Sequence, residues 1–524
     1  MECWASAVVY PTTEEEIRAA VARAQQSCQK VKVVSGFSHT IPKLVCPSSV
    51  GESIVISTAK LNSHIEVDVE NRRVTADSGV GLRALIDKVE AVGLSLVAAP
   101  YWEGFVVGKR WRRPRPSGGA PASCSGRESS GFAEIIELDG GDEAFNAAKI
   151  SLGLLGVISK VTFSLEPAFK RSISLSFRDD GRLQDEFMEL AGAHEFADIT
   201  WYPSQHSAVY RLDDRVPRNS SGEGRTTSWV SEPPYPVLQG EKVNEAARSR
   251  SGVCAMAAVE LAFKRLMANG LKNDGNLFLG YPVVGHQGRM QTSGSCVNSP
   301  ASDVLNACAW DPSIRGLFFF ETTAIFPAST FRGFVTDVKK LRDLRPEDFC
   351  GVDVYNGLLI RFIKASLAYL GQPEDSVAVD FNYFRADEPS TPRLNQDVWE
   401  EVEQMAFFKH RARPHWGKNR RVAFHGVPQK YPNFSEFQAV KMMLDPAGMF
   451  SSEWSDEILL GKEAADKEDG CAMEGLCICS EDRHCNPRHG YRCKPGLVYQ
   501  EARSADTQPL LQRPPYTKHV DSCR

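Results

Sequence analysis

The first third of the chain orders its predicted helices and strands in a way that excludes a simple repeat of strand–helix–strand units. The predicted elements are, in order, a helix that follows the threonine–glutamate capping box at 12–16, a strand at 31–34, alternating strands at 65–69 and 73–76, and a helix at 82–92. No Gly-x-Gly-x-x-Gly sequence opens a helix after the first strand, which weighs against a Rossmann fold. The order therefore predicts an α+β fold.

The composition is that of a large globular protein with a small or neutral ligand. The chain has 524 residues, 42% of them hydrophobic, which suits two or three domains with a sizeable core. Its 61 basic and 66 acidic residues give a net charge of -5, whereas nucleic-acid binding needs a concentrated positive field. No stretch approaches the roughly 18 uninterrupted apolar residues of a membrane span. We therefore expect no nucleic-acid partner and no integral membrane span.

Six of the 14 cysteines crowd the C-terminal end and predict a small separate module. They are Cys471, Cys477, Cys479, Cys485, Cys493 and Cys523. Zinc binding with His484 and His489 is one interpretation, but the Cys-x-x-Cys pairs of structural zinc sites are missing. Dense cysteines in a segment with little apolar core favour disulfides, so we expect a disulfide-stapled tail without a metal.

Two features bear on localisation and point in different directions. N-glycosylation acceptor sequences at 219–221 and 433–435 agree with a secretory route, as do the cysteines. Residues 1–30 nevertheless contain no apolar leader segment, so the chain as written has no signal peptide. The cysteines and the acceptor sequences therefore predict a secretory route, whereas residues 1–30 do not support it.

A loop at 413–419, with the sequence Arg-Pro-His-Trp-Gly-Lys-Asn, gathers a histidine, an aromatic ring and a lysine around a glycine. Loops that carry such groups on a rigid scaffold are frequent sites of chemistry. The alternative is a solvated loop with a half-buried tryptophan. The loop and the run Leu-Asp-Pro-Ala-Gly-Met-Phe at 444–450 together resemble the C-terminal signature of the sugar-lactone oxidases. These are flavoenzymes of the vanillyl-alcohol-oxidase superfamily, and the plant-type L-gulonolactone oxidases are the most similar group.

This resemblance implies an extracellular or vacuolar protein whose leader and first-domain opening lie upstream of the sequence as written. It also implies a domain organisation. We expect a two-part FAD-binding domain of the vanillyl-alcohol-oxidase type at 1–168, a substrate domain of sheet plus helices at 169–462, and the cysteine-rich tail at 463–524. In the second half, strands are predicted at 317–321, 358–362 and 377–384, helices at 331–341 and 398–408, and an exposed loop at 215–252.

The resemblance also assigns one set of cofactor-binding residues to the first domain. They are Gly36, Phe37, Ser38, His39 and Thr40 in the loop after the first strand, with Gly79 and Gly81 before the second helix. In many relatives the histidine that matches His39 is bonded to the 8α-methyl carbon of FAD, so a covalent bond through His39 is implied. The alternative is a histidine that only caps a strand-end turn.

A second cofactor signal lies at 151–163, where glycines precede an alternating strand. Periodicity alone predicts a buried turn, and glycines let the backbone approach a ligand closely. The resemblance implies that this turn lines the adenine and pyrophosphate side of FAD. The residues assigned to it are Ser151, Gly153, Gly156, Val157 and Ile158.

Residues 105–131 depart from the family. Relatives carry a glycine-rich FAD-covering loop here, whereas this chain reads as a run rich in Arg, Pro, Gly, Ala and Ser. A basic patch that grips phosphate is one interpretation. The lack of periodicity favours a disordered insert or a stretch translated in a shifted frame.

The activity implied by the resemblance is oxidation of the C2 hydroxyl of L-gulono-1,4-lactone or a related aldonolactone, as in L-gulonolactone and D-arabinono-1,4-lactone oxidases. FAD takes the hydride, O2 reoxidises FAD to give H2O2, and the product is the precursor of ascorbate. We expect Lys418, with His415 beside it, to stabilise the reduced flavin, and Arg385 to orient the substrate. His415, Glu321 and Asp380 are candidates for the group that takes the hydroxyl proton.

Two other functions are consistent with the same sequence. One is oxidation of an alditol or another sugar by the same superfamily, because the substrate pocket cannot be read from these motifs. The other is a catalytically silent, secreted binding protein whose cysteine-rich tail carries the function, because the segment 105–131 departs from the FAD-binding pattern.

Overall fold

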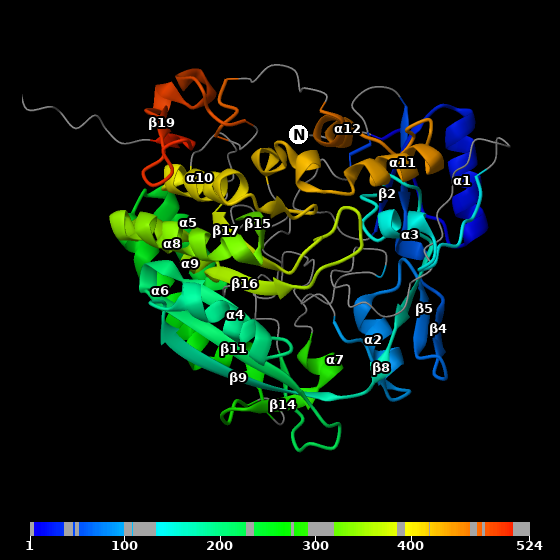
Figure 1. Cartoon of the computed structure of the whole chain (residues 1–524), viewed down its shortest axis with the longest axis horizontal. Coiled ribbons are helices and arrows are strands. Elements are labelled where there is room, and N and C mark those ends of the chain that lie inside the picture. Colours follow the sequence, from blue (N-terminus) through cyan, green and yellow to red (C-terminus); the bar gives the residue numbers. More distant parts are fainter. Residues whose placement is uncertain are drawn as a thin grey trace, which may run out of the picture.

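The computed structural model describes most of the chain. The residues it describes are 5–35, 46–47, 52–98, 107, 133–226, 235–273, 277–291, 319–384, 393–418, 420–461, 469–473 and 477–506. Its first elements lie on one side of the molecule, an eight-stranded sheet lies on the other, and the C-terminal tail sits beside helix α10 (Figure 1).

The first sheet is parallel and confirms the predicted helix and strand. It has the order β1-β3-β2, with bounds β1 (Ala7–Val9), β3 (Ser53–Ser57) and β2 (Lys30–Val34). Helix α1 (Glu14–Gln26) begins at Thr13, whose side chain accepts the N–H of Glu16, and it buries its apolar side against this sheet. The sequence did not predict β3, which completes the sheet.

A second, antiparallel sheet follows the predicted order of strands and helix. Its order is β4-β5-β7, with bounds β4 (Ile65–Asp68), β5 (Arg73–Asp77) and β7 (Lys160–Ser164). Helix α2 (Leu82–Glu90) packs on it through Leu85, Ile86 and Val89, all buried. The short elements nearby are β6 (Leu94–Ser95), α3 (Glu143–Ala148) and β8 (Glu166–Pro167).

The large sheet is antiparallel throughout, and its order is β14-β9-β11-β10-β16-β17-β15-β18. Its strands are β9 (Lys170–Asp179), β10 (Asp198–Tyr202), β11 (Ser207–Val216), β14 (Val283–His286), β15 (Phe319–Pro327), β16 (Leu358–Ile363), β17 (Ser376–Phe384) and β18 (Arg413–Pro414). The predicted strands at 358–362 and 377–384 are confirmed as β16 and β17. The strand predicted at 317–321 is part of β15, within the described residues.

Helices cover the apolar face of this sheet. They are α4 (Leu183–Ala193), α8 (Ala328–Leu344) and α10 (Gln396–Gln404), the last continued by a π-helical turn (Met405–Lys409). Phe187 of α4 packs edge-on against Phe331 of α8, and Trp399 of α10 packs against Phe381 of β17. The predicted helices at 331–341 and 398–408 are confirmed.

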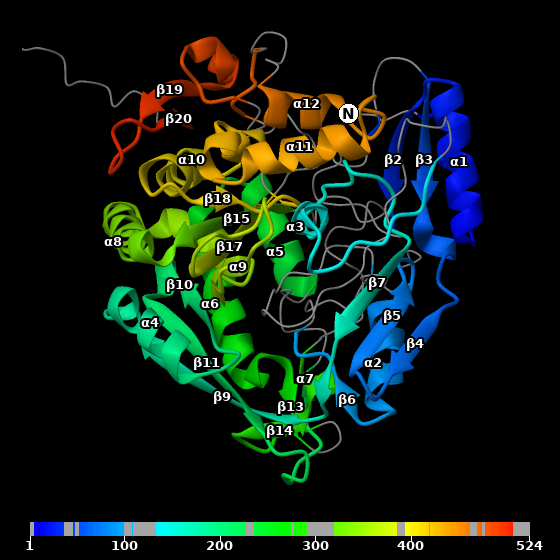
Figure 2. The same ribbon diagram turned by 45° about the vertical axis from the view of Figure 1, so that its right-hand side comes forward.

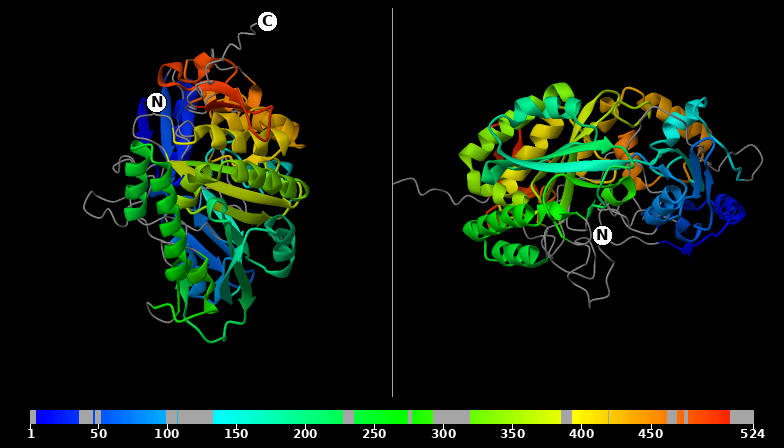
Figure 3. Two further views of the ribbon diagram at one scale, coloured as in Figure 1. Left: turned by 90° about the vertical axis from the view of Figure 1, so that its left-hand side faces the viewer. Right: turned by 90° about the horizontal axis from the view of Figure 1, so that it is seen from below.

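The exposed loop predicted at 215–252 is wrong over its second half. Helices α5 (Tyr235–Ala246) and α6 (Arg250–Leu266) occupy it and lie side by side (Figure 3, left). The disulfide Cys254–Cys350 joins α6 to α9 (Cys350–Val354). The polar composition of this segment is typical of a surface loop, but α5 buries carboxylates. One of them is Glu241, whose pKa is raised by burial.

The chain returns to the first sheet after the substrate region. Helices α11 (Phe434–Leu444) and α12 (Glu453–Leu460) cross toward α3 and the first sheet (Figure 2). Between them, Met449 O accepts the N–H of Val31 at 2.9 Å, and Phe450 is buried in the core of the first sheet. A segment inside the predicted region 169–462 therefore completes the core of the first domain.

The tail is a disulfide-bonded module, as predicted. Cys471–Cys477 and Cys479–Cys493 are bonded, and β19 (Arg492–Pro495) pairs with β20 (Arg503–Asp506). Cys485 is a buried free thiol, whereas Cys523 lies outside the described residues. The remaining short elements are β12 (Arg225–Thr226), β13 (Leu271–Lys272) and α7 (Gln287–Met290). Within the described ranges, every helix is too short or too polar to cross a bilayer.

The contact between the tail and α10 makes a testable pH dependence. Burial, and next the charge of Asp506 in β20, raise the pKa of Asp397 from 3.8 to about 6. The folded protein then binds more protons than the unfolded chain between these values, so stability falls as the pH rises from about 4 to 6. We expect Asp397→Asn to remove this dependence of stability on pH. Over the whole interval the change in the free energy of unfolding is at most roughly 3 kcal/mol.

Urea unfolding of wild type and Asp397→Asn at several pH values between 4 and 7 measures the effect. The variant should be the more stable protein above pH 6, and the two should converge near pH 4. Identical slopes for both proteins would show that Asp397 keeps its ordinary pKa in the folded protein.

Candidate active site

The face of the large sheet that the helices α4, α8 and α10 leave uncovered carries charged side chains from several strands. Register places Asp198 of β10 opposite both Arg211 of β11 and Arg361 of β16, and it places Asp380 of β17 opposite Thr323 of β15. Directly opposite residues in an antiparallel pair share a face. The charged side chains therefore form a row across the sheet, which we call the polar face.

Asp380 is the centre of the row at the β17 end. Its carboxylate bonds to the guanidinium of Arg361 and to the hydroxyl of Thr323, and the Lys418 Nζ lies 3.4 Å from its Oδ1. Both of its oxygens are thereby occupied by donors. Asp380 is thus suited to hold two cations in place, and less suited to take a proton from a substrate.

Lys418 stands between two carboxylates. Its Nζ lies 3.4 Å from Asp380 and 3.7 Å from Glu321 Oε1, and its side chain is 23% exposed. Among the described residues, Lys418 is the only polar partner of Glu321. The structure therefore brings together three of the predicted residues, and one oxygen of Glu321 has no donor in the part of the chain that the structure describes.

The part of the loop that leads to Lys418 is held to β15 and to the segment after β16. The N–H of His415 donates to Thr323 O at 3.1 Å, and the indole N–H of the fully buried Trp416 donates to Leu370 O at 3.0 Å. His415 Nδ1 accepts the N–H of Gly417 at 2.9 Å, so the neutral ring carries its proton on Nε2. In this tautomer His415 can donate a hydrogen bond through Nε2 but cannot take a proton there.

Two polar-face residues were not identified as site residues from the sequence. Arg361 holds Asp380, and Asn382 has a buried Oδ1 with no partner within the described ranges. Asn382 pairs in register with Glu321, so its amide lies beside the carboxylate. The available signal was a charge inside an apolar strand, as Arg361 is in the run 358–362. In a prediction from hydrophobic periodicity, such a charged residue only interrupts the apolar pattern and is not assigned a role.

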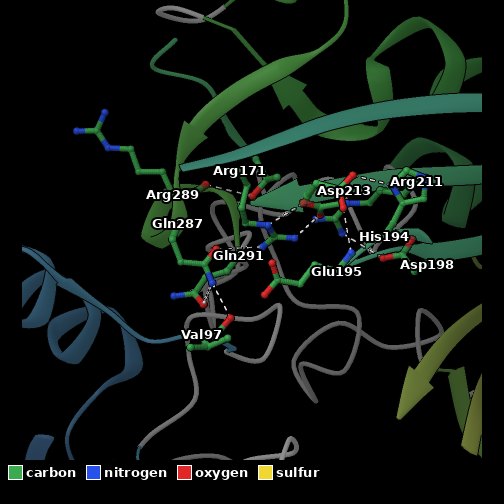
Figure 4. Close-up of polar contacts among 12 residues, drawn as sticks. Val97, Arg171, His194, Glu195, Asp198, Arg211, Asp213, Gln287, Arg289 and Gln291 are labelled. Atoms are coloured by element: carbon green, nitrogen blue, oxygen red, sulfur yellow. Dashed lines mark hydrogen bonds and ion pairs between the residues drawn. The ribbon is translucent and has the colours of Figure 1, made fainter. Parts of the chain in front are cut away.

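The row continues at the other end of the sheet as a fully buried ion-pair network (Figure 4). Asp213, with no exposed surface, lies between the guanidinium groups of Arg171 and Arg211, and Arg211 also pairs with Asp198 at 3.1 Å. Each carboxylate has a cationic partner, so the network satisfies its own charge. It stiffens the sheet between β9, β11 and β10.

Helix α7 joins this network to the first domain. Gln287, also without exposed surface, accepts from Arg171 at 3.4 Å and donates to Leu96 O and Val97 O at 3.1 and 2.7 Å (Figure 4). Gly288 adds a second tie, because Glu90 of α2 accepts its N–H at 2.6 Å. The segment after β6 is thereby fixed in position relative to the polar face.

The turn at 151–158 has the features of a dinucleotide-binding backbone. The side chains of Leu154, Leu155 and Val157 point into two cores, so they do not face a ligand. The N–H groups of Gly156, Val157 and Ile158 have no acceptor among the described residues. Gly156 has φ of 133°, which a side chain would make strained. The N–H groups of Gly153 and Leu154, in contrast, bond to Ser151.

The residues between β5 and α2 have different roles. Gly79 has a packing role, because a Cβ there would collide with the carbonyl oxygens of Thr58 and Leu61, and its N–H bonds to Leu61 O at 2.9 Å. Gly81 caps α2 and has open space around it. The buried hydroxyl of Ser78, which the sequence did not single out, has no partner within the described ranges and could bind FAD.

The remaining predicted site residues lie outside the described residues. They are Gly36, Phe37, Ser38, His39, Thr40 and Arg385. The atypical segment 105–131 does too, except for Val107, which is buried and whose N–H donates to Val80 O at 2.8 Å.

Comparisons with known proteins identify the family and the fold. Residues 5–108 match the FAD binding domain family, residues 327–458 match D-arabinono-1,4-lactone oxidase, and residues 468–507 match the L-gulonolactone oxidase 2-like C-terminal domain. Two cholesterol oxidases, a solvent-stable one and that of B. sterolicum, share the fold with TM-scores of 0.66 and 0.64. Each comparison covers 86% of this chain and 94% of the other, at 15% and 13% identity.

Full-length relatives are much more similar in sequence. L-gulonolactone oxidase 3 of Arabidopsis thaliana is 55% identical across 96% of this chain and 89% of its own length. L-gulonolactone oxidase 2 of the same plant is 43% identical, with 96% and 88% covered, and the Bos taurus enzyme is 22% identical, with 86% and 94% covered. The chain therefore belongs to the L-gulonolactone oxidase family, has the FAD-binding fold of the vanillyl-alcohol-oxidase superfamily, and is an FAD-dependent oxidoreductase of the oxidase type.

Proposed function

We propose that the protein oxidises the C2 hydroxyl of an aldono-1,4-lactone, with L-gulono-1,4-lactone as the substrate to test first, and that the product is the precursor of ascorbate. The observation that carries the proposal is the position of Lys418, held between Asp380 and Glu321 on the polar face of the sheet. The identity of 55% to a plant L-gulonolactone oxidase supports the substrate class.

A bound FAD would supply the acceptor for the hydride of the carbinol carbon, and its reoxidation by O2 would give H2O2. In this proposal Lys418 supplies the positive charge that stabilises the reduced cofactor, an effect that is often the largest in catalysis. Asp380, which is itself held by Arg361, holds Lys418 in place. The N–H groups at 156–158 and the Ser78 hydroxyl, which have no partner within the described ranges, would hold the dinucleotide.

Glu321 is the residue that we propose takes the hydroxyl proton. One of its oxygens has no donor within the described ranges, whereas those of Asp380 are occupied. His415 is the weaker candidate because its Nδ1 already accepts the Gly417 N–H. The Asn382 Oδ1, which has no partner among the described residues, can accept a hydrogen bond from another hydroxyl of a sugar lactone.

Purified protein provides the test. We expect a yellow protein that consumes O2 and releases an equimolar amount of H2O2 with L-gulono-1,4-lactone, and less with D-arabinono-1,4-lactone or an alditol. Turnover of alditols without turnover of lactones would overturn the substrate class. Turnover only with an artificial electron acceptor would overturn the role of O2, and a folded but colourless protein would overturn the enzyme itself.

A secretory location is part of the same proposal. Three disulfides lie within the described residues, and such bonds persist in oxidising compartments. Expression of the protein fused to a fluorescent protein tests the location, and cytosolic fluorescence would contradict it.

A further inference from the structure

The carboxylate of Glu403 lies directly behind the polar face, on the side of the sheet that α10 covers. It accepts the hydroxyl of Thr322 at 2.9 Å and the hydroxyl of Tyr383 at 3.2 Å, and it forms a bidentate ion pair with Arg420. Glu403 is 3% exposed, and its three partners come from β15, β17 and the loop after Lys418.

Each of these partners is a chain neighbour of a candidate active-site residue. Thr322 lies between Glu321 and Thr323, and Tyr383 follows Asn382, with the side chains pointing to the opposite face. Arg420 follows Lys418 by two residues. One buried carboxylate therefore ties together the three elements that carry Lys418 and the acids on either side of it.

Charge and hydrogen bonding hold the side chains of this cluster in place. Burial favours the neutral acid, but the guanidinium of Arg420 outweighs it and holds the pKa of Glu403 below its usual value. Burial raises the pKa of Tyr383 to about 12, so its hydroxyl remains a donor. Arg393 lies over the Tyr383 ring at 3.8 Å and adds positive charge. A charged, hydrogen-bonded carboxylate in such surroundings is costly to move.

We propose that Glu403 is a positioning residue, which sets the place of Lys418 relative to Glu321 and Asp380, and through it the charge presented to FAD. The inference rests on the proposed function only in placing Lys418 beside the flavin. Glu403 itself touches neither substrate nor cofactor in this account.

The chain offers a matched control on the same helix. Glu401 is 2% exposed and equally well bonded, but its oxygens accept the N–H groups of Leu497, Val498 and Tyr499 in the tail. Glu401→Gln therefore disturbs a buried carboxylate of α10 without touching β15, β17 or Arg420. Effects specific to Glu403 are those that Glu401→Gln does not show.

The test compares wild type, Glu403→Gln, Glu401→Gln, Lys418→Met and the double variant Glu403→Gln/Lys418→Met. We expect Glu403→Gln to lower kcat between about 10- and 100-fold with a smaller change in KM, as for a displaced catalytic group. It should also weaken the reversible bleaching of the bound flavin by sulfite, a probe of positive charge beside the flavin that needs no substrate. The double variant should lie within about twofold of Lys418→Met, because both changes act through one group.

The outcomes separate the two proposals. If the wild-type protein binds sulfite but oxidises no lactone, the proposed substrate is wrong. The role of Glu403 is then tested by the sulfite affinities of wild type and Glu403→Gln alone. Wild-type kcat and sulfite affinity in Glu403→Gln, or losses that add to those of Lys418→Met, overturn the inference. If Glu403→Gln does not retain FAD, Tyr383→Phe combined with Thr322→Val replaces it, since these changes remove only two hydroxyl donors. An unchanged kcat and sulfite affinity in that variant would also overturn it.

Discussion

Lys418→Met should abolish most of the activity while the protein keeps its fold and its FAD. We expect kcat to fall by about 100- to 1,000-fold, the usual cost of removing one preorganised group that stabilises charge in the transition state. Methionine keeps the length of the side chain and removes only the ammonium between Asp380 and Glu321. Steady-state kinetics with L-gulono-1,4-lactone and the flavin absorbance of the purified variant measure both parts.

Lys364→Met is the control for this substitution. Lys364 follows strand β16 and is 78% exposed, and among the described residues it pairs only with the half-exposed Asp375. Exposed pairs of this kind contribute little, so its kcat should stay at the wild-type value. A Lys418→Met enzyme with wild-type kcat would show that the charge near the flavin comes from another residue.

Asp213→Asn should destabilise the protein more than any other single change considered for the sheet. The carboxylate has no exposed surface and neutralises Arg171 and Arg211, both nearly buried. Removing one partner of a buried ion pair leaves uncompensated charge and costs about 3–5 kcal/mol. We expect a lower urea midpoint and weaker FAD retention, because Arg171 also holds Gln287 at the joint with the first domain.

The adjacent residue supplies the control for Asp213. Asp214 points to the other side of the strand, its side chain is 44% exposed, and it pairs with His194. Asp214→Asn should change stability by less than about 1 kcal/mol. Equal urea midpoints for Asp213→Asn and Asp214→Asn would show that the buried ion pairs of Asp213 do not stabilise the protein.

The elements that the sequence predicted well are those whose own residues determine them. Helix α1 has its cap at Thr13 and its apolar residues at helical spacing, so local information suffices. Helix α5 was missed because its buried Glu241 and Glu245 look like surface residues until the partners α6 and α9 are known. Parallel strand β3 was missed because its pairing with β1 depends on residues far apart in sequence.

The candidate site divides in a similar way. The motif at 413–419 identified Lys418 and His415, but only the pairing of β15 with β17 ranks Glu321 above Asp380 as a proton acceptor. Arg361, Asn382 and Glu403 gain their roles from register and packing, which a single sequence does not contain. The hydrogen bond from Gly417 to His415, which fixes the tautomer, is likewise visible only in three dimensions.

We propose that a lactone delivers its hydride to the bound flavin at the polar face around Lys418. Anaerobic mixing of the purified protein with L-gulono-1,4-lactone, followed by the flavin absorbance, tests it directly. We expect full bleaching in wild type, at least about 100-fold slower bleaching in Lys418→Met, and return of the colour with release of H2O2 when air is admitted. Flavin that stays oxidised in wild type, or that bleaches equally fast in Lys418→Met, would contradict it.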